Sequence, residues 1–177
     1  PVTFILSARL LREKGVVDFV DAAKKVKSLY PETRFVLLGG LDPNPSSLSL
    51  DEVTGWVSSG VIEWPGHVEV KPWLAQASVF VLPSYYREGI PRSSQEALAM
   101  SLPIITTDWV GCKETVVNNV NGFLVPIKNV DAIVEKMILF VKNPDLIAEM
   151  GNHSRIIAEQ KFSEKDKIIA QLHFLKC

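Results

Sequence analysis

The stretch VFVLPSYYREGIPRSSQEALAM, residues 79–100, contains a complete strand–loop–helix unit. It opens with VFVLP, an apolar run rich in β-branched and aromatic residues, as in a strand buried on both faces. Pro91 can begin a helix because the first helical turn needs no hydrogen bond from its backbone nitrogen. The stretch therefore predicts a strand over 79–83, a loop, and a helix from about Pro91 to Met100.

The same alternation continues on both sides of this unit. We expect strands at 2–7, 34–40, 61–64, 79–83, 102–107 and 122–126, and helices at 14–30, 50–59, 70–77, 91–100, 130–142, from about 145 and after 163. Strands that alternate with helices are typical of an α/β fold, a doubly wound parallel sheet with helices on both faces (Rossmann-like). In such sheets, ligands bind beyond the carboxyl ends of the strands, near the point where the strand order reverses. Candidate site residues should therefore be found in the segments 7–15, 39–45, 64–67, 84–91 and 106–112.

Composition and charge argue against several classes of function. The formal net charge of −1 at pH 7 gives no overall field that would recruit nucleic acid or an anionic membrane. Cys112 and Cys177 form neither a metal-ligand spacing nor a disulfide framework, which suggests a reducing compartment. No apolar run approaches the roughly 18 residues of a membrane span, and no signal peptide opens the chain. Because the chain starts directly in a strand and without Met, we expect an excised piece of a longer protein.

Two glutamates flank the predicted start of the helix at Pro91. The backbone N–H groups of Arg92 and Ser93 would be free at this helix end, beside the positive end of the macrodipole, so the position suits an anion. Glu96 would lie one turn further along, and Glu88 in the loop before the helix, with their carboxylates on the order of 10 Å apart. Ionised carboxylates are strong acceptors for sugar hydroxyls. The spacing suits a diphosphate with a hydroxyl-bearing ring at each end, although on spacing alone a solvated helix charge is an equal alternative for Glu96.

Weaker candidates lie at other strand ends. Arg9 and Lys14 follow the first strand and could supply counter-charge to an anion on the Pro91 helix, although most loop cations are solvated. Gly40 ends a glycine pair after the second strand and allows close backbone approach to a ligand. His67 follows the third strand, where a surface loop histidine is the more common role. The three histidines lack a metal-ligand spacing and the pattern GxGxxG is absent, so we expect neither a metal site nor a dinucleotide-binding fingerprint.

With these residues in place, the sequence resembles the C-terminal, donor-binding domain of a GT-B glycosyltransferase of family 4 (glycosyl transferases group 1). The resemblance runs over nearly the whole chain and is carried by ARLLREKG, FVLLGG, VIEWPGHV, VFVLPSYYREGIPRSSQEALAM, LPIITTD, GCKETV and NGFLVP. Glu88 and Glu96 form the family's E-x7-E signature, which is highly specific together with the flanking LPS and EALAM. The form EGIPRS is most similar to bacterial enzymes of capsule, exopolysaccharide and lipid-linked oligosaccharide assembly.

The resemblance implies a role for each candidate. Arg9 and Lys14 would neutralise the donor diphosphate as it leaves, and Glu88 would hold the hydroxyls of the transferred sugar, so these three are the implied catalytic residues. Glu96 would hold the ribose, and the base would lie near 64–67. The implied donor-binding residues are Gly40, His67, Gly89, Ile90, Pro91, Arg92, Ser93 and Glu96. The family transfers with retention of anomeric configuration and with no cofactor and no metal, from a nucleotide-sugar, and UDP is favoured because the similar bacterial enzymes mostly use it.

The chain departs from the family pattern in two ways. Where the family often has EGFGL, this chain has EGIPR, so Pro91 removes one N–H group from the phosphate cradle. The acceptor-binding N-terminal domain is absent, so we expect 1–177 to be a single donor-binding domain with little or no transferase activity alone. The acceptor, a glycan or a lipid-linked sugar, would bind through that absent domain. The resemblance implies a cytoplasmic protein, with peripheral association of the full-length protein at the inner face of the bacterial membrane, and no nucleic acid partner.

Three alternatives remain open on the sequence alone. A nucleotide-sugar epimerase shares the two-domain architecture, but the EALAM context and the pair Arg9 and Lys14 favour transfer. A non-catalytic nucleotide-sugar-binding module would need no neutralisation of a leaving group, which these two cations and Glu88 would supply. An NAD-binding domain is the weakest alternative because the glycine fingerprint is missing.

Overall fold

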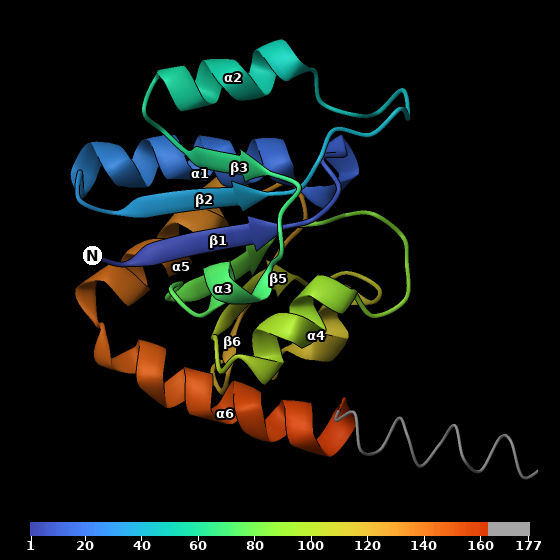
Figure 1. Ribbon diagram of the computed structural model, residues 1–177. Coiled ribbons are helices and arrows are strands. Elements are labelled where there is room, and N and C mark those ends of the chain that lie inside the picture. Colours follow the sequence, from blue (N-terminus) through green and yellow to red (C-terminus); the bar gives the residue numbers. More distant parts are fainter. Residues whose placement is uncertain (163–177) are drawn as a thin grey trace, which may run out of the picture.

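Six parallel strands form one sheet in the order β3-β2-β1-β4-β5-β6 (Figure 1). The structure, a computed structural model, describes residues 1–162. The strands are β1 (Thr3–Ser7), β2 (Arg34–Leu38), β3 (Glu63–Gly66), β4 (Val79–Leu82), β5 (Ile104–Thr107) and β6 (Gly122–Val125). The chain runs outward from β1 to β3, returns to β4 beside β1, and runs outward again to β6, so the order reverses between β1 and β4. This confirms the doubly wound α/β fold expected from the sequence.

Helices cover both faces of this sheet. They are α1 (Val16–Leu29), α2 (Leu50–Ser58), α3 (Lys71–Leu74), α4 (Arg92–Ala99), α5 (Val130–Lys142) and α6 (Asp145–Lys161), with two 3-10 turns, η1 (Arg12–Lys14) and η2 (Cys112–Thr115). Helix α1 packs against α5, and α4 packs against α6. Figure 1 shows α1 and α2 on one side of the sheet and α4 and α6 on the other. In the part of the chain that the structure describes, no helix has the length and apolar character needed to cross a membrane. The helix expected after Ser163 lies outside the described residues.

The two central strands are buried along their whole length. Every residue of β1 and of β4 is buried, as expected for apolar strands in the middle of a parallel sheet. The rings of Phe4 and Phe35 stack with their centroids 5.4 Å apart, and Phe19 of α1 meets Phe35 edge-on at 6.1 Å. Burial of each such side chain stabilises the fold by about 1.5–3 kcal/mol. This core fixes the positions from which the loops leave the carboxyl ends of the strands.

Strand β3 differs from the sequence expectation. It covers Glu63–Gly66 rather than 61–64. Val61 donates its backbone N–H to the carbonyl oxygen of Trp56, so it belongs to the turn that follows α2. The strand can pair with β2 only after that turn is complete, which moves its start by two residues.

Helix α3 is shorter than the helix expected over 70–77. It ends at Leu74, and the residues that follow lead directly into β4. Ser78 donates its backbone N–H to the carbonyl oxygen of Thr3 at 2.8 Å, and its hydroxyl accepts the Thr3 N–H at 3.0 Å. These two bonds hold the start of β4 beside β1 and end the helix early.

Candidate functional site

The loops that follow β1 and β4 lie side by side at the point where the strand order reverses. We name them the β1 loop (residues 8–15) and the β4 loop (residues 83–91). The carbonyl oxygen of Glu13 accepts the Tyr85 backbone N–H at 2.8 Å and the Ser84 hydroxyl at 3.2 Å. The two loops are therefore joined by backbone and side-chain hydrogen bonds.

Gly15 makes this close approach possible. Its φ is 79°, in the left-handed region, and a side chain there would collide with the carbonyl oxygen of Pro83. The helix expected from Lys14 therefore begins two residues later, at Val16, after η1 and this glycine. The turn directs Lys14 into the space between the loops.

Lys14 and Glu88 form an ion pair across the two loops. The Lys14 side chain is 8% exposed and that of Glu88 is 26% exposed. The Lys14 ammonium nitrogen also lies 4.6 Å from the ring centroid of Tyr86. An ammonium group that is removed from water needs such partners, because burying an unpaired charge is expensive. The structure thus brings together two of the three residues for which a catalytic role was implied.

Arg9, the third of these residues, lies at the rim of the same cluster. Its side chain is 58% exposed, and its guanidinium carbon is 6.0 Å from the Tyr86 ring centroid. One guanidinium nitrogen lies 3.4 Å from a carboxylate oxygen of Asp42, in the loop after β2. Arg9 is held loosely here, since a pair at this distance and exposure contributes little.

The start of α4 presents an uncapped helix end. Pro91 is the N-cap residue, with φ −61° and ψ 129°, rather than the first helical residue, and among the residues that the structure describes no side-chain oxygen caps this helix end. Arg92 points away from the protein with a 93% exposed side chain, 3.9 Å from Glu96, which is 43% exposed. Ser93 is partly buried. The backbone donors of this turn are available to an anion, whereas the Arg92 side chain extends into solvent.

Gly89 and Ile90 form the open part of the β4 loop. A side chain built at Gly89 would meet no atom within 4 Å, so packing does not require glycine there. Ile90 is exposed. The space next to this backbone is therefore open to a ligand.

Gly40 and His67 come from neighbouring loops after β2 and β3. A side chain at Gly40 would make ordinary contact, 3.5 Å, with the Cβ of His67. The Trp64 indole N–H donates to the carbonyl oxygen of Gly39 at 2.8 Å and fixes the spacing of these loops. His67 itself is exposed. The structure places this pair at the same end of the sheet as Lys14 and Glu88.

The floor of the β4 loop includes residues that the sequence did not single out. The Thr107 hydroxyl donates to the carbonyl oxygen of Ser84. Gly111 has a φ of 84°, and a side chain there would collide with the backbone oxygens of Glu88 and Gly89. Burial raises the pKa of the Cys112 thiol above its ordinary value, while neighbouring hydroxyls oppose the shift. These residues support the loop from below rather than facing a ligand.

Tyr86 and Asp42 were also missed. The ring of Tyr86 faces both Lys14 and Arg9, and Asp42 pairs with Arg9. An aromatic residue two positions before Glu88 was the available signal for the first. Asp42 lies in the segment 39–45, one of the strand-end segments in which the fold class predicts site residues.

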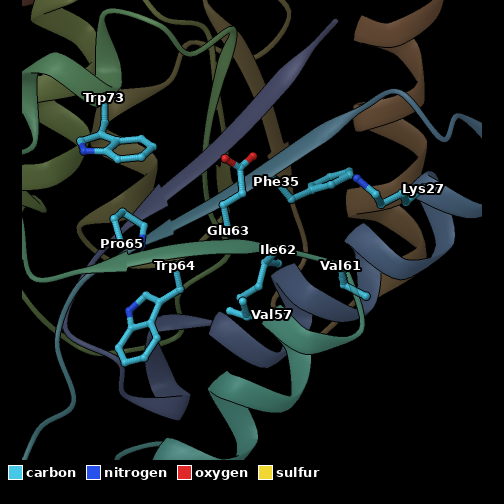
Figure 2. Close-up of a pocket in the computed structure, with 10 residues that line it drawn as sticks. Lys27, Phe35, Val57, Val61, Ile62, Glu63, Trp64, Pro65 and Trp73 are labelled. Atoms are coloured by element: carbon cyan, nitrogen blue, oxygen red, sulfur yellow. The ribbon is translucent and has the colours of Figure 1, made fainter.

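A cavity of about 460 Å³ lies along edge strand β3, away from these clusters. Figure 2 shows Glu63 and Trp64 extending from opposite sides of β3, with Trp73 above the strand and Val57 below it. Arg34 donates two hydrogen bonds to Glu63 and thereby lowers the pKa of that carboxyl. The lining of this cavity includes Trp64 and Pro65 of the segment 64–67, near which the base was expected, but none of the individually named donor-binding residues. Within residues 1–162, no group of three or more His, Cys, Asp or Glu side chains is placed to hold a metal ion.

Comparison with known proteins identifies the family. Residues 1–143 match the family model described as glycosyl transferases group 1. The chain belongs to this family. The match confirms the resemblance found in the motifs, and it favours the glycosyltransferase hypothesis over the NAD-binding and epimerase alternatives.

Individual known proteins align with most of the chain. The N,N'-diacetylbacillosaminyl-diphospho-undecaprenol alpha-1,3-N-acetylgalactosaminyltransferase of Campylobacter jejuni is 33% identical over 168 residues, 94% of this chain and 42% of the relative. The pneumococcal O-GlcNAc transferase GtfA, solved with UDP and GlcNAc, has a TM-score of 0.84 at 22% identity, over 99% of this chain and 35% of that one. HepE of Anabaena, solved with UDP-glucose, has a TM-score of 0.82 at 20% identity, over 97% of this chain and 48% of that one. At these identities the two structures show the fold alone, and the chain spans less than half the length of each protein.

Proposed function

We propose that this chain binds the donor of a glycosyl transfer, a nucleotide-sugar, with UDP as the favoured nucleotide. The observation that carries the proposal is the Lys14–Glu88 pair, which lies where the strand order reverses and beside the loop that leads to the uncapped start of α4. A buried cation, a carboxylate and an open helix end meet the needs of a diphosphate attached to a sugar.

The two cations would act on the leaving diphosphate. Transfer breaks the bond between the anomeric carbon and a diphosphate oxygen, while the acceptor hydroxyl oxygen bonds to that carbon and loses its proton. Negative charge grows on the diphosphate as the first bond breaks, so Lys14 and Arg9 would stabilise the transition state more than the bound donor. The ammonium group has three donors, which allows Lys14 to reach a phosphate oxygen while it stays bonded to Glu88. Transfer with retention of configuration and without a metal remains part of the proposal.

The carboxylates would hold the two rings of the donor. Glu88 would accept hydrogen bonds from the transferred sugar, because it lies beside the proposed diphosphate position. Glu96, one turn into α4, would accept from the ribose. The backbone of 89–93 would face the phosphates, and the segment 64–67 would face the base. His67 and Gly40 would border this last position.

The relatives support the choice of substrates. HepE and GtfA were solved with UDP-glucose and with UDP, respectively, which favours UDP here. The name of the Campylobacter relative contains diphospho-undecaprenol, which favours a lipid-linked or glycan acceptor at the cytoplasmic face of a membrane. The chain covers 42% of that relative, so we propose that a separate N-terminal domain binds the acceptor. Residues 1–177 alone would then bind donor with little or no transfer.

Calorimetric titration of the 177-residue chain with UDP, GDP and ADP, each with and without EDTA, tests the proposal. We expect UDP to bind more tightly than the other two, and to bind equally well with and without EDTA. Absence of binding by all three diphosphates would overturn the donor-binding function. Binding of UDP that disappears with EDTA would overturn its independence from metal.

A further inference from the structure

A second cavity is lined by one residue from each of the same two loops and by neighbouring residues. Its volume is about 360 Å³, and it is lined by Arg12, Val17, Asp18, Tyr85 and Lys128. We name it the α1 pocket, because two of these residues belong to the first turn of α1. Its volume falls within the range of about 300–1,000 Å³ that is usual for ligand sites. None of its residues belongs to the proposed donor site.

Asp18 is the group in this pocket that lacks a partner. Its Oδ2 atom is buried, and within the described part of the chain it has no hydrogen-bond partner. Desolvation raises the pKa of the Asp18 carboxyl, the nearby Asp21 carboxylate raises it further, and Lys128 lowers it. A buried acceptor without a donor is destabilising in a folded protein. The pocket therefore offers a hydrogen-bond acceptor that a bound ligand can satisfy.

The charges around Asp18 restrict the class of ligand. The Lys128 ammonium nitrogen lies 4.8 Å from the ring centroid of Tyr85, and Arg12 donates to Glu52 at 2.6 Å. Arg12 and Lys128 would repel a cationic amine, whereas Asp18 and Glu52 would repel a phosphate. A neutral ligand that carries hydroxyl groups avoids both repulsions and can donate to Asp18.

The pocket is also close to the proposed donor site along the chain. Tyr85 lines the α1 pocket, and the next residue, Tyr86, faces Lys14. Arg12 and Lys14 are the two ends of η1. Each site therefore takes residues from both of these loops, which hydrogen bonds join at Glu13. A ligand in one site lies against the backbone that shapes the other.

We propose that the α1 pocket is a subsite for a neutral saccharide unit of the acceptor, whose hydroxyl groups donate to Asp18. The name acceptor rests on the proposed glycosyl transfer, whereas the existence of a saccharide site does not. The pocket would hold a unit of the acceptor other than the one that reacts. The donor half of the enzyme would in this way take part in choosing the acceptor.

Amide NMR spectra of the 15N-labelled chain, recorded during titration with methyl glycosides, test this inference. The probes are methyl β-D-glucopyranoside, methyl β-D-galactopyranoside and the methyl glycoside of N-acetylglucosamine, each at millimolar concentrations. We expect at least one of them to shift the resonances of Asp18, Tyr85 and Lys128. If none does, or if inorganic phosphate shifts them instead, the saccharide subsite is overturned.

Asp18→Asn separates a ligand-binding role from a structural one, with Asp51→Asn, in the exposed first turn of α2, as a matched control. Asp18→Asn should weaken the glycoside about tenfold and leave the free energy of unfolding at pH 7 unchanged or increased, because it removes a desolvated charge. Asp51→Asn should leave both nearly unchanged. A loss of stability in Asp18→Asn with unchanged glycoside binding would contradict the inference. UDP titrated into the same samples reports on the donor site separately, so a failure there leaves the saccharide result interpretable.

Discussion

The ammonium group of Lys14 pairs with the carboxylate of Glu88 although 74 residues separate them in the chain. The pair joins the β1 loop to the β4 loop at the point where the strand order reverses. Both groups are largely withdrawn from water, so each depends on the other for compensation of its charge. In the proposed reaction, the diphosphate would add a second partner for Lys14.

The first prediction concerns the cations and the diphosphate. Lys14→Ala and Arg9→Ala should each weaken UDP about tenfold or more and leave uridine nearly unchanged, because only the diphosphate carries the charge that they face. Lys24→Ala, which removes an exposed lysine of α1, is the matched control and should affect neither ligand. Calorimetric titration of each variant with UDP and with uridine measures both affinities. Equal losses for both ligands would mean that these cations do not face the phosphates.

The second prediction concerns stability. Lys14→Ala should lower the free energy of unfolding by about 1–3 kcal/mol, because Glu88 is left without its partner in a partly buried position. Arg9→Ala should lower it by less than about 1 kcal/mol, because an exposed pair at 3.4 Å contributes little. Urea denaturation measures both values. If the two variants were equally stable, the burial of the Lys14–Glu88 pair would have no energetic consequence.

The third prediction uses two glycines of the same region. Gly89→Ala should leave stability nearly unchanged, because the added methyl group meets no protein atom, but it should weaken UDP, because it would narrow the proposed phosphate position. Gly111→Ala should unfold more easily, because its φ is 84° and its side chain would collide with the backbone of the β4 loop. Thermal denaturation and UDP titration give the four values needed. If Gly89→Ala bound UDP normally, the phosphates would not lie beside Gly89.

The fourth prediction concerns the thiol beneath the β4 loop. Because burial raises the pKa of Cys112, the folded protein should keep this thiol protonated at pH 8. In a Cys177→Ser background, iodoacetamide should therefore label the folded chain at least about tenfold more slowly than the chain in urea. Equal labelling rates would show that folding neither buries this thiol nor raises its pKa.

The raised pKa of Cys112 also makes the free energy of unfolding depend on pH. As the pH rises through the ordinary thiol value of 9.0, the unfolded chain releases the Cys112 proton first. The free energy of unfolding should then fall with rising pH, and below that range the thiol should contribute no pH dependence. Denaturation curves between neutral and alkaline pH measure this slope.

The sequence predicted the order of strands and helices because the apolar runs are strong and local. Helix α5 begins and ends at the predicted bounds, 130–142, and the structure shows the Asn129 side chain accepting the N–H of Ala132 at its start. Of the boundaries that were wrong, the start of β3 depends on the local turn that the Val61–Trp56 bond closes, whereas the end of α3 depends on a distant partner. The end of α3 is set by bonds between Ser78 and Thr3, and these cannot be seen in the local pattern.

The candidate site was predictable in its residue types and less so in its contacts. The motifs named Lys14 and Glu88, but only the fold shows that they pair with each other. Tyr86 was missed because its signal, an aromatic residue two positions before Glu88, does not by itself show that the ring faces Lys14 and Arg9. The unpartnered oxygen of Asp18 could not be predicted either, because an acidic residue in the first turn of a helix is common and usually solvated.

If Glu88 and Glu96 hold different ends of one donor, a crossed titration should separate their roles. UDP and UDP-glucose are titrated into Glu88→Ala and Glu96→Ala, with Glu135→Ala, on the surface of α5, as the control. We predict that Glu96→Ala weakens both ligands about tenfold or more. We predict that Glu88→Ala leaves UDP nearly unchanged and weakens UDP-glucose by a similar factor. Equal weakening of UDP by both variants, or no weakening of either ligand by either variant, would contradict the account.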